Sequence, residues 1–182
     1  MSQPHPVTVP HLIEALSRVA ARDFPVREVR ALLDGIRLPS AELAPYRFLS
    51  AAHYTRNLIH KSEEFELLLL VWAAGQRSPI HGHEGEKCWT RVEEGELHFT
   101  SYREKAAGDS FRLQVLSQAV GQVGHVDGPA DIHEVANRSE LPAVTLHLYA
   151  RPYDECDVYD LERHTKTRKK LEYFSRFGRQ TG

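Results

Sequence analysis

The amino-acid sequence predicts a mainly β chain, a sandwich or barrel, with a small helical segment at its N-terminus. Residues 8 to 36 carry apolar side chains at helical spacing. From residue 46 onward, short apolar runs alternate with Gly, Pro, Asp and Asn. Many short strands separated by turn residues are typical of antiparallel sandwiches and barrels rather than of a parallel sheet.

The N-terminal segment is expected to form two helices. Leu12, Leu16 and Val19 recur at the helical period. Pro25 interrupts this pattern and can begin a second helix, because proline is tolerated in the first helical turn. Pro39 ends the region, and a short helical piece is expected over residues 41 to 43.

Eight candidate strands follow, each rich in β-branched, aromatic or leucine side chains. They cover residues 54–59, 66–73, 88–92, 96–102, 111–116, 119–123, 132–135 and 143–150. Residues 93–96 predict a hairpin turn, and the polar tail from 160 is expected to end in an edge strand or without regular structure. We therefore expect a single domain over residues 1–182, with helices over 1–44, a β-barrel core over 45–160 and a C-terminal tail over 161–182.

The composition excludes several classes of function. A net charge of −2 gives no reason to expect nucleic acid or membrane as a partner. The basic run over residues 163–170 is interpreted as a solvated face rather than a polyanion site. Two cysteines are too few for a disulfide framework, and no signal peptide or membrane span is found. These features favour a cytoplasmic protein with reduced thiols.

The most informative motif is a pair of histidines, His81 and His83. Residues two apart on an extended strand point to the same face, so both imidazoles can converge on one ion. Alone, this pair is weak evidence. Gly75 lies six residues before His81, Gly95 lies twelve after His83, and His133 begins a His-x3-Asn pattern.

These spacings resemble the two motifs of the cupin superfamily, which implies a cupin-type β-barrel, or jelly roll. Where cupins carry a glutamate ligand, this chain has Cys88. Three neutral imidazoles without a carboxylate leave part of the ion open to substrate and O2. They also suit Zn²⁺, so the ligands alone do not select iron.

A cupin with cysteine in place of that glutamate resembles the cysteine dioxygenase family. The resemblance covers residues from about 46 to 160, in four segments around Arg56, His81, His133 and Tyr149. It implies that His81, His83 and His133 bind Fe(II). The family arginine that holds the substrate carboxylate matches Arg56, whose planar guanidinium suits bidentate binding.

The resemblance also assigns residues around the metal. Tyr54 matches a tyrosine of the carboxylate pocket, and Cys88 with Tyr149 matches a pair that forms a thioether crosslink in animal members. Thr145, His147 and Tyr149 alternate along one strand and match an outer triad in which the histidine orients the tyrosine. The bond between Arg151 and Pro152 matches an X-Pro bond that is cis in the family.

The implied activity is oxidation of L-cysteine by O2 to cysteine sulfinic acid, with both oxygen atoms added to sulfur, in a monomer that needs no organic cofactor. Three alternatives remain. His147 could replace His133 as the third ligand, although the His-x3-Asn pattern favours His133. The substrate could be another small thiol such as 3-mercaptopropionate, whose enzymes typically have glutamine in place of Arg56. The chain could also be a non-catalytic, metal-binding cupin.

Overall fold

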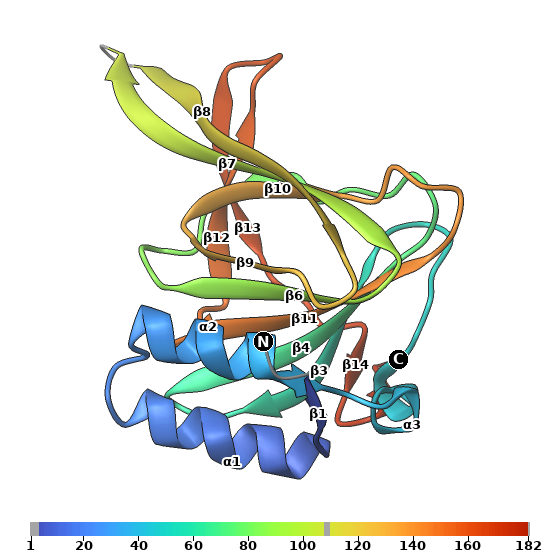
Figure 1. Ribbon diagram of the computed structural model, residues 1–182. Coiled ribbons are helices and arrows are strands. Elements are labelled where there is room, and N and C mark those ends of the chain that lie inside the picture. The colour runs from blue at the N-terminus through green and yellow to red at the C-terminus, as the bar shows by residue number, and fades with distance from the viewer. Residues whose placement is uncertain (1–3, 108–109, 182) are drawn as a thin grey trace.

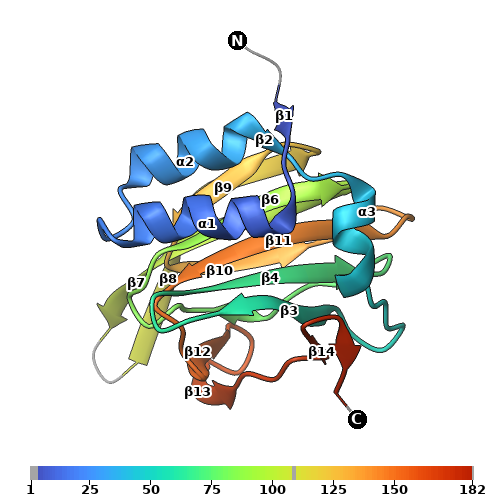
Figure 2. The same ribbon diagram turned by 90° about the horizontal axis from the view of Figure 1, so that it is seen from below.

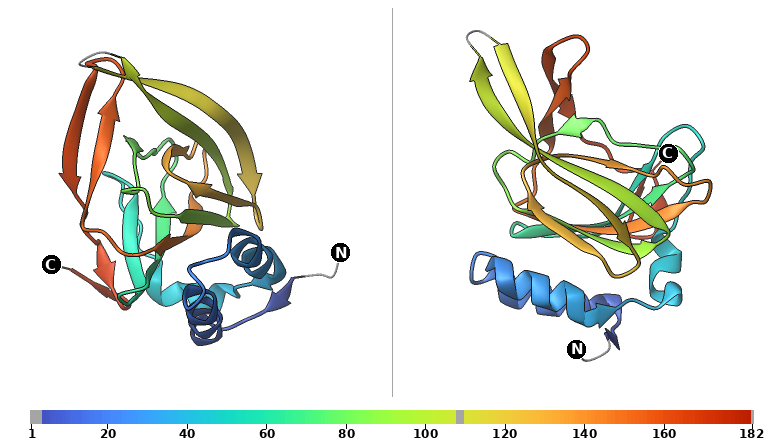
Figure 3. Two further views of the ribbon diagram at one scale, coloured as in Figure 1. Left: turned by 90° about the vertical axis from the view of Figure 1, so that its left-hand side faces the viewer. Right: turned by 45° about the horizontal axis from the view of Figure 1, so that its top comes forward.

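The computed structural model describes residues 4–107 and 110–181, which form two facing β-sheets with helices packed outside one of them (Figures 1 and 3). The expected mainly β architecture with an N-terminal helical segment is confirmed. A minor two-stranded pairing joins the N-terminal strands β1 (His5–Pro6) and β2 (Ile36–Arg37).

The helical segment contains α1 (Val9–Ala20), α2 (Val26–Gly35) and α3 (Ser40–Leu43), followed by a 3-10 turn at Ala44–Tyr46. Thr8 caps α1, because its hydroxyl accepts a hydrogen bond from the His11 amide at 3.4 Å. Both main helices begin and end close to the predicted positions, with the break at Pro25. In the ranges that the structure describes, no helix has the length and apolar character needed to cross a bilayer.

The two large sheets pair strands that lie far apart in sequence. The seven-stranded sheet has the order β15 (Arg179–Gln180), β14 (Ser175–Arg176), β3 (Thr55–Lys61), β4 (Phe65–Trp72), β11 (Ala143–Ala150), β6 (Cys88–Glu94) and β9 (Val126–Ala130). The six-stranded sheet has the order β13 (Thr165–Lys170), β12 (Glu155–Asp160), β5 (Ile80–His81), β10 (Ile132–Ala136), β7 (Glu96–Ala107) and β8 (Ser110–Gln122).

Strands β4 and β11 are neighbours in the seven-stranded sheet and are buried along their whole length. Alternate residues face opposite sides of a strand, so each of these strands serves two cores. Leu67, Leu69 and Leu146 pack against the helices, which lie across this sheet in Figure 2. Leu68 and Tyr149 face the interior between the sheets. A strand covered on both faces needs no polar residues in alternation, which explains the apolar run of β4.

Three local expectations differ from the structure. The two predicted strands over 111–116 and 119–123 form one continuous strand, β8, which pairs with β7 along its length. Strand β9 and the hairpin of β12 and β13 were not expected. The cis bond is Gly128–Pro129 rather than Arg151–Pro152, and Arg151 instead has a left-handed φ of 59°. The hairpin turn at residues 93–96 is confirmed, with Gly95 at φ 76° between β6 and β7.

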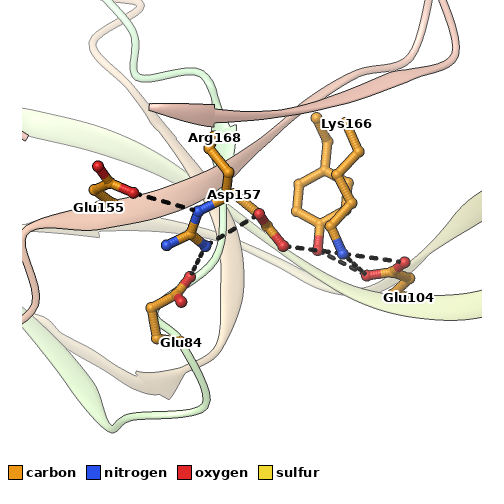
Figure 4. Close-up of polar contacts among 7 residues, drawn as sticks. Glu84, Glu104, Glu155, Asp157, Lys166 and Arg168 are labelled. Carbon is orange, nitrogen blue, oxygen red and sulfur yellow. Dashed lines mark hydrogen bonds and ion pairs between the residues drawn. The ribbon is translucent and has the colours of Figure 1, made fainter. Parts of the chain in front are cut away.

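The hairpin of β12 and β13 gives the basic run a structural role. Lys166 and Arg168 both bind Asp157 of the paired strand, at 3.0 and 3.2 Å. Figure 4 shows this network, whose further acidic members are Glu84, Glu104 and Glu155. The positive charges of these two side chains are therefore matched within the chain.

A buried arginine ties the helical segment to the sheet. The Arg91 side chain on β6 is 3% exposed and lies 2.5 Å from the Glu93 carboxylate, whose side chain is 4% exposed. Its guanidinium also donates to the Leu33 and Ile36 carbonyls, at 2.9 and 2.6 Å, where α2 ends. Arg91 thus satisfies carbonyl groups that the end of a helix leaves without partners.

We expect Arg91→Ala to lower the free energy of unfolding by about 3–5 kcal/mol, because it leaves the buried Glu93 charge and the carbonyls unpaired. Urea unfolding followed by circular dichroism measures this change. The matched control is Arg47→Ala, which removes an exposed ion pair with Glu94, the residue after Glu93. This variant is expected to lower the free energy of unfolding by at most about 1 kcal/mol. Equal losses in the two variants would contradict the role given to Arg91.

Candidate metal centre

Three histidines converge between the two sheets. His81 is on β5 and His133 on β10, and the two residues are directly opposite each other in the antiparallel pairing of these strands. His83 follows two residues after His81 but lies beyond the end of β5. The expectation that one strand carries both residues is therefore wrong, because the chain leaves the sheet after His81. The rings of His81 and His83 nevertheless lie close together, as expected.

The three rings form a compact cluster. Ring centroids lie 5.0 Å apart for His81 and His83, 4.8 Å for His81 and His133, and 4.6 Å for His83 and His133. One nitrogen from each ring lies within 4.8 Å of the others. No other group of histidine, cysteine or acidic residues in the described ranges could hold a metal ion.

Backbone carbonyls orient two of the rings. His81 Nδ1 lies 3.0 Å from the Pro79 carbonyl oxygen, and His83 Nδ1 lies 2.5 Å from that of Asp131. A carbonyl at Nδ1 favours a proton on that nitrogen and leaves Nε2 as the electron-pair donor. His83 Nε2 is buried and has no hydrogen-bond partner among the described residues. A metal ion at the centre of the cluster would satisfy this nitrogen, so the residues fit a metal.

Burial keeps these imidazoles neutral. It lowers the pKa of His81 to about 4, with smaller contributions in the same direction from Arg56 and Lys169. Burial likewise holds the pKa of His83 and of His133 well below the usual range, and the neighbouring histidines lower it further. A histidine must be neutral to bind a metal, so the cluster is ready for a ligand role at neutral pH.

His147 lies outside the cluster and has other partners. Its Nε2 lies 2.9 Å from Thr145 Oγ1, and its Nδ1 lies 3.3 Å from the Tyr149 hydroxyl. The Trp72 indole N–H donates to Thr145 Oγ1 at 2.9 Å, so the chain continues into the core. Both ring nitrogens of His147 are thus engaged, which favours His133 as the third ligand.

Tyr149 and Cys88 are directly opposite each other on the neighbouring strands β11 and β6. Both are buried, at 4% and 1% exposure, and Cys88 is a free thiol. Burial holds the pKa of Tyr149 well above its usual range, and the nearby Cys88 raises it further. The Tyr149 ring lies 5.8 Å from that of His83, so the phenol is beside the histidine cluster.

Arg56 is on β3, in the same sheet as β11, and its side chain also lies close to Tyr149. Its guanidinium carbon lies 5.9 Å from the centre of the Tyr149 ring. Tyr54 lies just before β3 and stacks on Trp72 at 4.5 Å between centroids. Arg56, Tyr54 and His81 all line one pocket of about 440 Å³. A fixed positive charge therefore shares a pocket with His81 of the histidine cluster.

Sequence reasoning missed several residues of this pocket. Tyr153 lines it and has ring contacts with Tyr149 at 5.8 Å and His83 at 6.2 Å. Cys156 is buried and also lines the pocket. The C-terminal tail also lines the pocket, through Tyr173 and Phe174. The aromatic residues of the tail were the available signal, since they interrupt an otherwise polar and basic segment.

Comparisons with known proteins relate most of the chain to one family. The sequence model of the family described as cysteine dioxygenase type I matches residues 1–162. The chain is 31% identical to cysteine dioxygenase type 1 of Rattus norvegicus over 181 residues, covering 97% of this chain and 90% of the rat protein. The Homo sapiens protein of that name is 30% identical, with the same shares. Among solved structures, an RmlC-like cupin from Desulfovibrio desulfuricans is similar over 59% of this chain and 91% of its own, with 25% identity and a TM-score of 0.40. The two facing β-sheets of the structure and the match to the family model agree with the cupin-type β-barrel that the sequence resemblance implied.

We expect the three-histidine cluster to bind one divalent ion. His133→Ala should weaken Fe(II) affinity by at least about 100-fold, whereas the matched variant His147→Ala should weaken it by about tenfold or less, because it removes only an outer partner. Anaerobic titration and metal analysis after gel filtration measure both. A loss in His147→Ala as large as that in His133→Ala would make His147 a ligand.

Proposed function

The chain belongs to the cysteine dioxygenase type I family, and from this premise we propose that it oxidises L-cysteine with O2 to cysteine sulfinic acid in the cytoplasm. One thiol and one O2 give one sulfinic acid, so both oxygen atoms end on sulfur and no further reductant is needed. The observation that carries the proposal is a pocket lined both by Arg56 and by His81, a member of the neutral three-histidine cluster.

His81, His83 and His133 would hold Fe(II). When bound, this ion supplies a site at which the thiolate and O2 meet and a route for electrons from sulfur to oxygen. Residues of the chain itself would bind the substrate and hold a proton beside the reacting atoms. With three protein ligands and no carboxylate among them, a bound ion would keep coordination positions for both reactants.

Arg56 would bind the substrate carboxylate. Burial on its own would lower the pKa of Arg56, but the nearby tyrosines 149, 54 and 153 and the Glu66 carboxylate raise it, so the guanidinium stays charged. Arg56 forms no ion pair with a carboxylate among the described residues, and its polar contact is the Glu172 carbonyl at 3.4 Å. Its planar fork is therefore free for a bidentate contact. Tyr54 would line the same carboxylate site.

Tyr149 would act as a proton-bearing group beside the reacting atoms. Because burial raises the pKa of its phenol, Tyr149 keeps its proton at neutral pH. Burial lowers the pKa of His147 to about 3, so this imidazole is neutral and able to hold the Tyr149 hydroxyl in place. Thr145 fixes the opposite side of the His147 ring. The three residues form a line from the core to the pocket, which limits rotation of the phenol.

We further propose a thioether crosslink between Cys88 and Tyr149, as in animal members of the family. The supporting observation is their direct opposition across β6 and β11. The bond joins the Cys88 sulfur to the Tyr149 ring carbon beside the hydroxyl, with loss of the thiol hydrogen and one ring hydrogen to O2. The crosslink would fix the phenol further without removing its hydroxyl.

The direct test is turnover by the Fe(II)-loaded protein. With L-cysteine in air, we expect one O2 consumed for each sulfinate detected by mass spectrometry, and both oxygen atoms should come from labelled O2. Intact-mass spectra of the same samples should show a species lighter by two hydrogens, absent in Cys88→Ser. No O2 uptake with any small thiol would overturn the enzymatic proposal and favour a non-catalytic metal-binding cupin.

Arg56→Gln tests the substrate. We expect kcat/KM for L-cysteine to fall by about 10- to 100-fold, because a charged contact to the carboxylate is lost, and the preference for L-cysteine over 3-mercaptopropionate to decline. The control is Arg47→Gln, an exposed arginine of the helical side, which should match the wild type. An unchanged preference in Arg56→Gln would remove the reason for choosing cysteine.

A further inference from the structure

The C-terminal segment 171–177 runs beside strand β3, which carries Arg56. Its strand β14 pairs in parallel with β3, with Ser175 opposite Asn57. The two buried side chains also bond, since the Ser175 hydroxyl donates to Asn57 Oδ1 at 2.8 Å. The amide of Phe174 donates to the Arg56 carbonyl at 2.8 Å. The segment is therefore fixed to the backbone of Arg56. It lies beyond residue 162, where the match to the family model ends.

Tyr173 of this segment contacts the Arg56 side chain. The guanidinium carbon of Arg56 lies 5.4 Å from the centre of the Tyr173 ring. It lies 5.9 Å from the centre of the Tyr149 ring, which is beside the histidine cluster. Arg56 Nη1 also donates to the carbonyl of Glu172 at 3.4 Å. The segment thus provides one aromatic contact and one acceptor, and both restrict the positions that the guanidinium can take.

A buried carboxylate holds Tyr173 in turn. The Tyr173 hydroxyl donates a short hydrogen bond to Glu66 Oε1. Glu66 is 2% exposed, and Lys61 Nζ lies 2.7 Å from the same oxygen and 3.2 Å from the Tyr173 hydroxyl. A buried carboxylate is costly unless it is paired and hydrogen-bonded. Among the described residues, the Glu66 carboxylate bonds with Tyr173 and Lys61, so it fixes the position of Tyr173 in addition to supporting the charge of Arg56.

We propose that Tyr173, anchored by Glu66 and Lys61, is a positioning residue that fixes the Arg56 guanidinium for the carboxylate of the substrate. The inference rests on the proposed function and adds a role for the C-terminal segment in selecting substrates. A long arginine side chain loses conformational freedom when it binds a ligand. An arginine already held by the ring and the Glu172 carbonyl loses less, so the carboxylate binds more tightly.

Kinetics separate positioning from a general structural role. In Tyr173→Leu, which removes the ring, we expect the KM for L-cysteine to rise about tenfold while kcat changes by less than about twofold. Tyr173→Phe keeps the ring but loses the bond to Glu66, and it should raise KM by a smaller factor, as should Glu66→Gln. Arg179→Ala, an exposed residue of the adjoining strand β15, is the control and should match the wild type.

Cysteamine supplies the matched ligand, because it keeps the thiol and the amine of cysteine but lacks the carboxylate. Anaerobic titration of the Fe(II)-loaded protein should show weaker binding of L-cysteine in Tyr173→Leu and unchanged binding of cysteamine. If both ligands weaken equally, or if kcat falls while KM stays constant, the segment is only a structural support and the inference is overturned.

A spectroscopic measurement keeps the inference separate from the enzymatic proposal. In protein labelled with ¹⁵N-arginine and loaded with diamagnetic Zn²⁺, the Nε–H signal of Arg56 is assigned by its loss in Arg56→Gln. We expect this signal to shift and to exchange faster with water in Tyr173→Leu, but not in Arg179→Ala. An unchanged Arg56 signal overturns the positioning role, whatever thiol the protein oxidises. Absence of cysteine turnover with a changed signal contradicts the proposed function alone.

Discussion

The burial of both faces of β11 is the constraint on which the site depends. Leu146 and Leu148 pack toward the helices, while Thr145, His147 and Tyr149 alternate with them and face the interior. A slip of one residue in the register of β11 would turn Thr145, His147 and Tyr149 toward the helices. It would also place leucines beside the histidine cluster. The hydrophobic core outside the barrel therefore fixes which side chains the barrel encloses. The helices contribute to the site without touching it.

Burial then sets the protonation of the enclosed groups. Removal from water disfavours the charged form of each group, so the histidines stay neutral and the phenol of Tyr149 stays protonated. These are the states that metal binding and proton donation require. Arg56 is the exception, because its charge is supported by the surrounding phenol oxygens and by Glu66. The interior thus combines neutral ligands with one lasting positive charge.

Much of this arrangement was predictable because the relevant signals are local. The alternation in β11, the spacing of His81 and His83 and the turn at Gly95 are each contained within a few residues. The strand predictions that failed depend on pairing between strands, which no short stretch of sequence shows. Strand β8 continues through polar Ser117 and Gln118 because it pairs with β7 on both sides of a bulge next to Ser117. The hairpin of β12 and β13 forms although its side chains are charged, since its cations bind acidic residues across the sheet.

The C-terminal segment 171–177 was the hardest element to predict from the sequence, and it bears most directly on the proposed substrate specificity. Three histidines would accept zinc as well as iron, so the cluster does not define the substrate. In the proposed function, selection for a carboxylate depends on Arg56, whose guanidinium contacts residues more than a hundred positions away. Those residues lie in a tail whose composition suggests only solvent exposure, and the buried Glu66 that anchors it sits in a strand of leucines. The two features look anomalous separately, a carboxylate in a core and aromatic residues in a basic tail. When the tail pairs with β3, Tyr173 gives the buried Glu66 carboxylate a hydrogen-bond donor, and Glu66 holds Tyr173 in place. In the proposed role of Tyr173, the Arg56 guanidinium is thereby positioned before any ligand binds.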